Sequence, residues 1–354
     1  MTGLIVLVLL IVGIVLLTGS SGTPPPTTPT VGHHSKGSPA DPGWRGDGKP
    51  VTLAFGGDIH FQGALETRLA ADPTTALGAT APKLMTGADL SMASFDSALT
   101  DGTCPDPQSK PYVWYSPASA LTAFKGGGLS LVTMATDHAE DCGVAGLQMS
   151  LTEADAARYP VIGIGSTATQ AYAAYRITVD GQRIAVVAGT QLLPQASWAA
   201  TATQPGVAAA SGLVAAVKAV RKTADTVVVY VHWGTTAATC PNVQQPPLAK
   251  ALVKAGADIV VGSGSHVQEG AGYLGQAYVD YGLGNLAFYN TTAPETYSGS
   301  LVVTATGREV KSASWRPALI TDDVPQVLSG PAATTAVKRW NGLRACAGLA
   351  QRPT

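Results

Sequence analysis

Apolar segments alternate with helix-like segments from about residue 50 to residue 350, and this alternation constrains the fold more than any other feature of the chain. Several apolar segments are continuous, such as TVVVYVHW at 226–233. A strand without polar alternation is typical of a sheet covered on both faces. Strands that alternate with helices predict an α/β fold. We expect strands at 51–55, 90–95, 130–135, 161–165, 183–189, 226–232, 258–262, 276–281 and 301–306, and helices at 63–71, 117–125, 146–158, 207–223 and 246–255.

The end of the chain follows a different pattern. No helix-like segment separates the last expected strands, which favours antiparallel additions to the sheet. Residues 331–349 are expected to form a closing helix. We find no internal repeat and no second core, so residues 50–350 are expected to form a single domain.

The first 49 residues differ from the rest. Residues 4–17 are continuously apolar, and residues 1–18 reach the lower limit for crossing hydrocarbon, about 17 residues. The same length suits the apolar part of a secretion signal, although the first basic residue is Lys36. We expect a transmembrane anchor or a signal segment at 1–18, and a buried core helix is the third alternative. Residues 19–49 are rich in Pro, Thr and Gly and predict an extended linker. Both leading alternatives place the domain outside the cytoplasm, on the cell membrane or secreted.

Composition excludes two classes of protein. Hydrophobic residues make up 45% of the chain and charged residues 13%, so the chain is not intrinsically disordered. The net charge is −1 and no basic stripe is visible, so we expect no nucleic-acid partner.

Four cysteines fall within the expected domain, and none belongs to a C-x-x-C pair. An exported domain meets oxidising conditions, where disulfides persist. Four cysteines allow three pairings. We expect Cys104–Cys142 and Cys240–Cys346, the second of which would tie the C-terminal segment to the core. Four buried free thiols are the alternative.

The only four histidines of the expected domain share one placement. His60, His138, His232 and His266 each follow or end an apolar strand. The carboxyl ends of strands are where α/β sheets build their sites. A shared site is therefore favoured over four separate structural histidines.

Three aspartates have the same placement as the histidines. Asp58 precedes His60 by two residues, so a continuing strand points both side chains the same way. Asp96 ends the second expected strand, and Asp137 ends the third, next to His138. Carboxylates combined with imidazoles suit Zn, Mn or Fe. The sequence therefore predicts one or two divalent ions, which bring attacking and leaving oxygens together in phosphoryl hydrolysis. The candidate metal ligands are Asp58, His60, Asp96, Asp137, His232 and His266.

An ordered set of motifs resembles the CapA family of poly-γ-glutamate capsule-synthesis proteins, which are similar to calcineurin-like metallophosphoesterases. The motifs are GGDIH at 56–60, ASFDSALT at 93–100, ATDHAEDCGVAGL at 135–147, HWGT at 232–235, VVGSGSHVQEG at 260–270 and YGLGNLAFY at 281–289. The resemblance implies a layered α/β/β/α sandwich with a metal site at one edge. It further implies that Asp96 bridges two ions and that His138 helps to donate a proton to the leaving group.

Three positions depart from the family pattern. Asp137 stands where the family has Asn, Asp96 where it has Glu, and Gly264 where it has the first histidine of an H-x-H motif. Glycine offers no ligand, so one ion of a pair loses a side chain. Asp137 compensates in charge, or else the site holds one ion or none.

Two functions follow from the resemblance. One is a surface-anchored metallohydrolase that acts on a phosphoester or on a bond of an envelope polymer, with His138 as the acid. The other is a non-catalytic assembly factor that holds an anionic polymer or a partner of the capsule-synthesis machinery, with a degenerate metal site. An exported α/β domain with purely structural histidines is the third alternative.

Overall fold

The computed structural model describes residues 46–289 and 292–354. The expected anchor or signal segment (1–18) and most of the expected linker (19–45) lie outside the described residues. Within the described part of the chain, no helix has the length and apolar character needed to cross a membrane.

An eight-stranded sheet forms one half of the fold, in the order β18-β17-β16-β1-β2-β5-β6, with β15 also paired to β1. Strands β1, β2, β5 and β6 run parallel, and β16, β17 and β18 add antiparallel. The expected antiparallel addition is thus confirmed for the strand at 301–306, but it is wrong for the strand at 276–281, which pairs parallel with 259–261. The strands are β1 (Val51–Ile59), β2 (Leu90–Phe95), β5 (Leu131–Thr133), β6 (Val161–Ile162), β15 (Asn285–Ala287), β16 (Tyr297–Thr306), β17 (Glu309–Thr321) and β18 (Val324–Val327).

A six-stranded sheet forms the other half, in the order β13-β14-β12-β11-β9-β8. Its four central strands run parallel, and one antiparallel strand closes each edge. The strands are β8 (Tyr175–Val179), β9 (Gln182–Thr190), β11 (Thr226–His232), β12 (Ile259–Ser263), β13 (Ala271–Leu274) and β14 (Ala277–Asp280). Two small ladders pair β3 (Ala98–Thr100) with β4 (Tyr115–Pro117) and β7 (Ile164–Gly165) with β10 (Gly206–Val207).

Strand β11 explains why the sequence is continuously apolar there. Val228 and Tyr230 belong to the core shared with the eight-stranded sheet, and the Tyr230 hydroxyl donates to the Gly56 carbonyl of β1 at 2.8 Å. Val227 and Val229 belong to a second core on the other face. Successive strand residues point to opposite faces, so a strand buried on both faces has no polar alternation.

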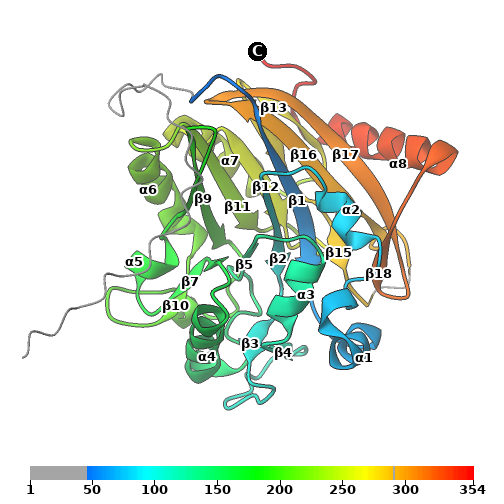
Figure 1. The fold of residues 1–354 in the computed structure, drawn as a ribbon. Helices are drawn as coiled ribbons and strands as arrows, with labels where there is room; N and C mark the ends of the chain where they lie inside the picture. The colour runs from blue at the N-terminus through cyan, green and yellow to red at the C-terminus, as the bar shows by residue number, and fades with distance from the viewer. Residues whose placement is uncertain (1–45, 290–291) are drawn as a thin grey trace, which may run out of the picture. The chain divides into compact units, whose positions relative to one another are not determined.

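Helices cover the outer faces of the two sheets (Figure 1). Helices α6 (Ala210–Arg221) and α7 (Gln245–Ala255) pack on the six-stranded sheet, through side chains such as Leu213 and Leu252. Helices α1 (Ala64–Ala71), α2 (Ala81–Met85) and α3 (Ala120–Gly126) pack on the eight-stranded sheet. The expected α/β/β/α sandwich is thus confirmed. The remaining helices are α4 (Gly143–Ala156), α5 (Ala168–Ala171) and α8 (Gly330–Gly342).

Helix α8 is shorter than the expected helix at 331–349. It ends at Gly342, and a 3-10 turn, Leu343–Cys346, follows. The helix ends at a glycine because glycine is unfavourable inside a helix. The 3-10 turn then places Cys346 next to its disulfide partner, Cys240. Trp340 of α8 stacks on Trp315 of β17 with ring centroids 5.4 Å apart.

Both expected disulfides are confirmed. Cys104 is bonded to Cys142, and Cys240 is bonded to Cys346 across 106 residues of sequence. The described residues contain no free cysteine.

Candidate metal centre

The carboxyl ends of parallel strands from both sheets meet at one edge, and the predicted site residues lie there. Asp58 lies in β1 and His60 directly follows it, while Asp96 directly follows β2. Asp137 and His138 follow β5 after a short connection. His232 is the last residue of β11, and His266 lies three residues beyond β12. Glycine at position 57 lets β1 lie close to the backbone of Gly284, because a Cβ atom at this position would lie 1.7 Å from the Gly284 carbonyl oxygen.

Asp58 is the point at which the two sheets meet in this site. Its Oδ1 atom lies 3.5 Å from Nδ1 of His232, and its Oδ2 atom lies 3.6 Å from Nδ1 of His266. The Gly264 amide donates to Oδ2 at 2.9 Å. Oδ1 is fully buried and has no hydrogen-bond partner among the described residues. Burial alone would raise the pKa of Asp58, but the close approach and charge of His232 outweigh burial and lower the pKa.

Asp96 lies on the opposite side of the same two histidines. Its Oδ1 and Oδ2 atoms lie 4.0 Å from Nε2 of His232 and Nε2 of His266, respectively. Both carboxylate oxygens are buried without a hydrogen-bond partner among the described residues, and burial raises the pKa of Asp96. His232 and His266 are therefore held between two buried carboxylates.

Asp137 joins this group from β5. Its Oδ1 atom lies 3.0 Å from Nε2 of His232. Ligand atoms of Asp96, Asp137 and His138 all lie within 4.8 Å of one another. Burial would raise the pKa of Asp137, but its hydrogen bond to His232 outweighs burial and lowers the pKa. His232 has the opposite balance: burial would lower its pKa, but the charges of Asp96, Asp137 and Asp58 raise it well above the usual value.

His60 lies in an aromatic enclosure beside this group. Its ring stacks on Phe288 with centroids 3.9 Å apart and contacts Trp114 edge-on at 4.6 Å. Both ring nitrogens are buried without a hydrogen-bond partner in the described chain. Burial lowers the pKa of His60 well below its usual value, so the ring is neutral.

The buried polar atoms that have no hydrogen-bond partner among the described residues show whether the site suits a metal ion. Buried polar atoms without partners are costly, and buried carboxylates are normally paired or bound to metal. Asp58, His60 and Asp96 contribute five such atoms at one edge of the sheets. A divalent cation satisfies carboxylate oxygens and neutral imidazole nitrogens together. The chemistry of these residues therefore suits a divalent ion, and the ligand atoms that the described residues bring within 4.8 Å of one another belong to Asp96, Asp137 and His138.

Gly264 supplies backbone instead of a side chain. Its φ is +102°, a conformation that side chains rarely adopt. A Cβ atom there would lie 2.7 Å from the Trp233 carbonyl oxygen and 3.0 Å from the His232 ring. Neighbouring atoms thus occupy the space that a ligating side chain at position 264 would need. The backbone amide of Gly264 instead donates a hydrogen bond to Asp58.

His138 is held by Asp141, which lies in the same sequence motif, and by Lys110 and Trp114, which the sequence did not identify. Its Nδ1 atom lies 2.6 Å from Oδ2 of Asp141, and its ring stacks on Trp114 with centroids 3.8 Å apart. Lys110 donates to Oδ1 of Asp141 at 2.8 Å and to the Asp137 carbonyl at 2.6 Å. Lys110 and Trp114 lie in an irregular segment without periodicity, so no sequence pattern pointed to them.

Asn285 was also missed as a site residue. Its side-chain oxygen lies 3.0 Å from Nδ1 of His266 and orients that ring. The only sequence signal was its place in the YGLGNLAFY motif.

A cavity of about 340 Å³ opens onto the site. Its walls combine aromatic side chains with the polar groups of the site, and no Lys or Arg appears among its described lining residues. The lining residues are Tyr112, Trp114, Asp137, His138, Thr236, His266, Phe288, Tyr289 and Glu295.

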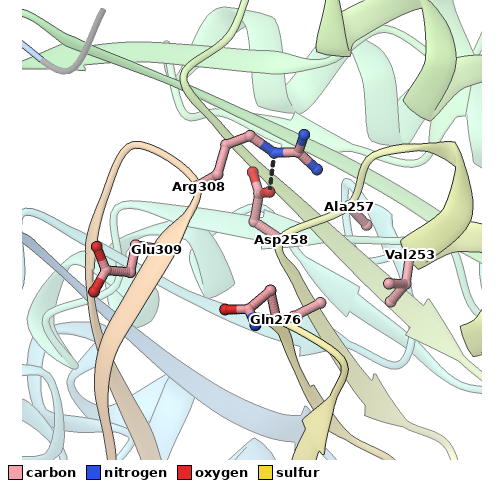
Figure 2. A pocket seen from close by; sticks show the side chains of 7 residues that line it. Val253, Ala257, Asp258, Gln276, Arg308 and Glu309 are labelled. Carbon is pink, nitrogen blue, oxygen red and sulfur yellow. Dashed lines mark hydrogen bonds and ion pairs between the residues drawn. The ribbon is translucent and has the colours of Figure 1, made fainter. Parts of the chain in front are cut away.

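Two larger cavities lie elsewhere. One of about 440 Å³ is lined by Asp258 and Arg308, which form an ion pair (Figure 2). Asp258 directly precedes β12, at the end of the strand opposite the site, and also pairs with Arg221. Asp258 is already paired with Arg308 and Arg221, and Glu309 is paired with Lys311, so this cavity offers no chemistry comparable to the metal centre. The other, of about 710 Å³, lies between the amino ends of α6 and α7 and has no charged lining residue among those described.

Comparison with known proteins gives a family and distant structural likenesses. The family described as "Bacterial capsule synthesis protein PGA_cap" matches residues 52–290. The chain is 31% identical over 172 residues to the PGA biosynthesis protein CapA of Bacillus subtilis (strain 168), which covers 48% of this chain and 45% of that protein. It is 32% identical over 175 residues to the capsule biosynthesis protein CapA of Bacillus anthracis, covering 48% of this chain and 42% of that protein. The matches thus span less than half of either relative. Among solved structures, a novel phosphatase from Mycoplasma pneumoniae is similar with a TM-score of 0.48 and 11% identity, covering 81% of this chain and 97% of that chain.

Proposed function

Because the chain belongs to the bacterial capsule synthesis protein PGA_cap family, we propose that it acts in the synthesis or attachment of an anionic capsule or cell-envelope polymer of the poly-γ-glutamate type. Two relatives that carry the name CapA, for PGA biosynthesis and for capsule biosynthesis, support this role. Within that role, the site supports a metal-dependent hydrolase best. The observation that carries this proposal is the set of five buried, unpartnered ligand atoms on Asp58, His60 and Asp96.

The ligands of the proposed metal come from both sheets. Asp58, His60, Asp96 and His266 would hold one ion, and Asp96, Asp137 and His232 would hold a second. When bound, a divalent ion acts as a Lewis acid toward a phosphoryl or carbonyl oxygen. The ion is Mn, Zn or Fe, because the ligands are carboxylates and imidazoles.

His138 is the proton donor in this proposal. An Asp141 carboxylate that accepts from Lys110 and from the Trp114 amide also accepts the Nδ1 proton of His138. The Nε2 atom is left on the side of Asp137, 3.8 Å from Oδ2, where the cavity opens. A proton on Nε2 can pass to the leaving oxygen of a substrate in the cavity, and the charge of Asp141 stabilises the doubly protonated ring.

We further propose export. The apolar residues 1–18 would hold the domain outside the cytoplasm as a membrane anchor, or would be cleaved from a secreted protein. Two disulfides support an oxidising compartment.

The test is metal-dependent cleavage of a generic phosphodiester and of poly-γ-glutamate by the purified chain. We expect turnover that requires metal and falls by about 10²–10⁴-fold in His138→Gln. Asp155→Asn, on the exposed surface of α4, is the matched control. Turnover that His138→Gln leaves unchanged would exclude this mechanism.

A non-catalytic polymer-binding factor is the second candidate, and Gly264 is the observation that favours it. The glycine removes a ligand from the second ion site and its neighbours fill the space. Metal-free chain that binds poly-γ-glutamate, without metal-dependent turnover, would support this candidate.

A further inference from the structure

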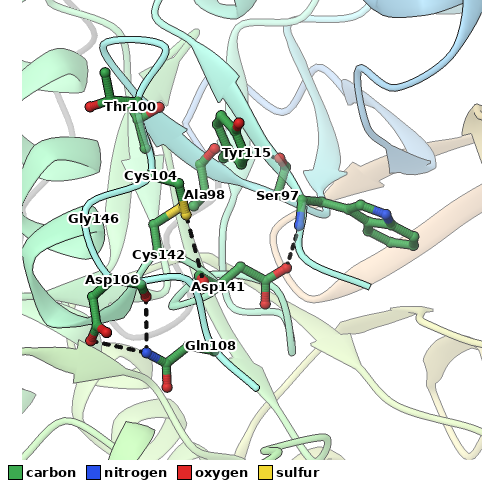
Figure 3. Close-up of a disulfide and its surroundings, with 12 residues drawn as sticks. Ser97, Ala98, Thr100, Cys104, Asp106, Gln108, Tyr115, Asp141, Cys142 and Gly146 are labelled. Carbon is green, nitrogen blue, oxygen red and sulfur yellow. Dashed lines mark hydrogen bonds between the residues drawn. A yellow bond between two sulfur atoms is a disulfide. The ribbon is translucent and has the colours of Figure 1, made fainter. Parts of the chain in front are cut away.

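The connection between β3 and β4 carries residues onto the proposed proton donor. Residues 101–114 contain no helix or strand, although both ends are fixed. Strands β3 and β4 pair on either side of it, and the Cys104–Cys142 disulfide ties it to the residue next to Asp141. Figure 3 shows this disulfide with Asp141 and Gln108 beside it. The backbone amide of Gln108 donates to the backbone carbonyl of Asp141 at 2.9 Å. The segment therefore lies along the backbone that carries Asp141, the hydrogen-bond partner of His138.

Every polar atom of the Asp141 carboxylate is used by this segment or by His138. Oδ2 accepts from the Trp114 amide at 2.6 Å and lies 2.6 Å from His138 Nδ1. Oδ1 accepts from Lys110 Nζ at 2.8 Å. The Asp141 side chain is fully buried, and Lys110 is only 14% exposed. Lys110 Nζ also lies 3.2 Å from His138 Nδ1, but the Asp141 oxygen is nearer, at 2.6 Å. A carboxylate placed among these donors can only accept, so we assign the proton of His138 to Nδ1.

Trp114 fixes the plane of the same imidazole. The two rings stack with centroids 3.8 Å apart and planes 16° apart. Trp114 is itself buried, at 8% exposure. Rotation of the His138 ring would break this stack and the Nδ1 hydrogen bond together. Lys110 also donates to the Asp137 carbonyl at 2.6 Å, which holds the backbone next to His138.

We propose that Lys110 and Trp114, on the disulfide-tethered segment 104–114, are positioning residues that keep Nδ1 of His138 protonated against Asp141. Nε2 then faces the cavity, where it carries the proton for the leaving group when the ring is doubly protonated. This inference rests on the proposed role of His138 as proton donor. It assigns the Cys104–Cys142 disulfide to the support of His138, whereas the Cys240–Cys346 disulfide ties the C-terminal segment to the connection between β11 and α7. Removal of the Cys240–Cys346 disulfide is therefore the matched control for removal of the Cys104–Cys142 disulfide.

The ring state of His138 is the readout, because a merely structural role of Lys110 would not change it. Nitrogen-15 spectra of the histidine rings in the full chain, at fixed pH and with His138→Gln for assignment, report which nitrogen carries the proton. We expect Nδ1 to be protonated in the unmodified chain, with Nε2 as the nitrogen that gains and loses its proton. Lys110→Met and the double variant Cys104→Ser/Cys142→Ser should show His138 averaged between the Nδ1–H and Nε2–H forms. Lys110→Arg and Cys240→Ser/Cys346→Ser should keep the Nδ1–H form.

Turnover gives the second readout. Lys110→Met should lower kcat by about 10–100-fold with little change in KM, and Lys110→Arg should restore most of it. If the cysteine variant fails to fold by near-ultraviolet circular dichroism, Lys110→Met decides the question. A folded Lys110→Met that keeps His138 in the Nδ1–H form would overturn the proposal. An inactive unmodified chain whose ring state still depends on Lys110 would refute the hydrolase while supporting the positioning role.

Discussion

The Nε2 atom of His232 lies 3.0 Å from Oδ1 of Asp137, although His232 ends a strand of one sheet and Asp137 follows a strand of the other. The contact joins the two sheets at their carboxyl ends. It also places a carboxylate beside the position at which, in our proposal, Gly264 leaves a second ion without a side-chain ligand. We interpret Asp137 as the substitute for that missing ligand.

Asp137→Asn tests this substitution. The amide keeps the shape of the side chain but loses its charge, so the second ion is held less strongly. We expect metal affinity to fall about tenfold or more, which corresponds to roughly 1.4 kcal/mol. Titration calorimetry with Mn²⁺ or Zn²⁺ measures the affinity, with Asp155→Asn as the control for loss of an exposed carboxylate. Equal affinities in both variants would refute the role of Asp137.

His60→Leu separates a ligand from a structural residue. Leucine loses ring stacking on Phe288, worth about 0.5–1.5 kcal/mol, but it removes two buried unpartnered nitrogens that each cost about 1–3 kcal/mol. We therefore expect the variant to be as stable as the unmodified chain in chelator, or more so. Added metal should raise the melting temperature of the unmodified chain far more than that of the variant. A large loss of stability in chelator would indicate a structural histidine.

Gly264→Ala tests the close packing around the site. A Cβ atom at this position meets the Trp233 carbonyl oxygen at 2.7 Å and the His232 ring at 3.0 Å. Gly102→Ala is the matched control, because Gly102 has φ +98° and no heavy atom within 4 Å of a Cβ. Backbone strain alone costs about 1–3 kcal/mol in each variant. We expect Gly264→Ala to lose more stability than Gly102→Ala in urea unfolding, and also to weaken metal binding. Equal losses would show that the space around Gly264 is not restrictive.

The buried side chain of Glu269, which is not one of the proposed metal ligands, should make the free energy of unfolding depend on pH. Burial raises the pKa of Glu269 to about 8, from an ordinary value of 4.5. The folded protein therefore holds a proton that the unfolded chain releases, and stability falls as the pH rises from 4.5 to about 8. The slope from one proton is about 1.4 kcal/mol per pH unit. Glu269→Gln should remove this contribution from denaturant unfolding measured between about pH 5 and about pH 7. Glu66→Gln, on the exposed side of α1, should leave the slope unchanged.

The Cys240–Cys346 disulfide is expected to stabilise the fold without affecting the site. It closes 106 residues of sequence, and loss of a native disulfide typically costs about 2–5 kcal/mol. We expect Cys240→Ser/Cys346→Ser to lower the free energy of unfolding by this amount and to keep its metal affinity. A loss of metal affinity in this variant would show that the C-terminal segment supports the site.

The sequence predicted much of the fold because buried parallel strands are continuously apolar. The boundaries of β2 and β11 were predicted to the residue, and Asp58, Asp96, His232 and His266 were placed at the strand ends where the structure brings them together. Strand β17 was not predicted. A bulge opposite Thr304 and Ala305 shifts its register and breaks its alternation.

The groups around His138 could not be predicted in the same way. Lys110 and Trp114 contact His138 because a disulfide and an irregular connection hold their segment beside it. An irregular connection has no periodic pattern of apolar residues from which its position could be predicted. The same holds for Gly264. Its departure from the family pattern was visible, but only the structure shows that its neighbours fill the space.

Elemental analysis of the chain, purified without chelator, tests the central claim most directly. We predict at least one Mn, Zn or Fe ion per chain, and its loss in Asp58→Asn and Asp96→Asn but not in Asp155→Asn. A folded chain without bound metal, and with no affinity for these ions in titration, would contradict the account.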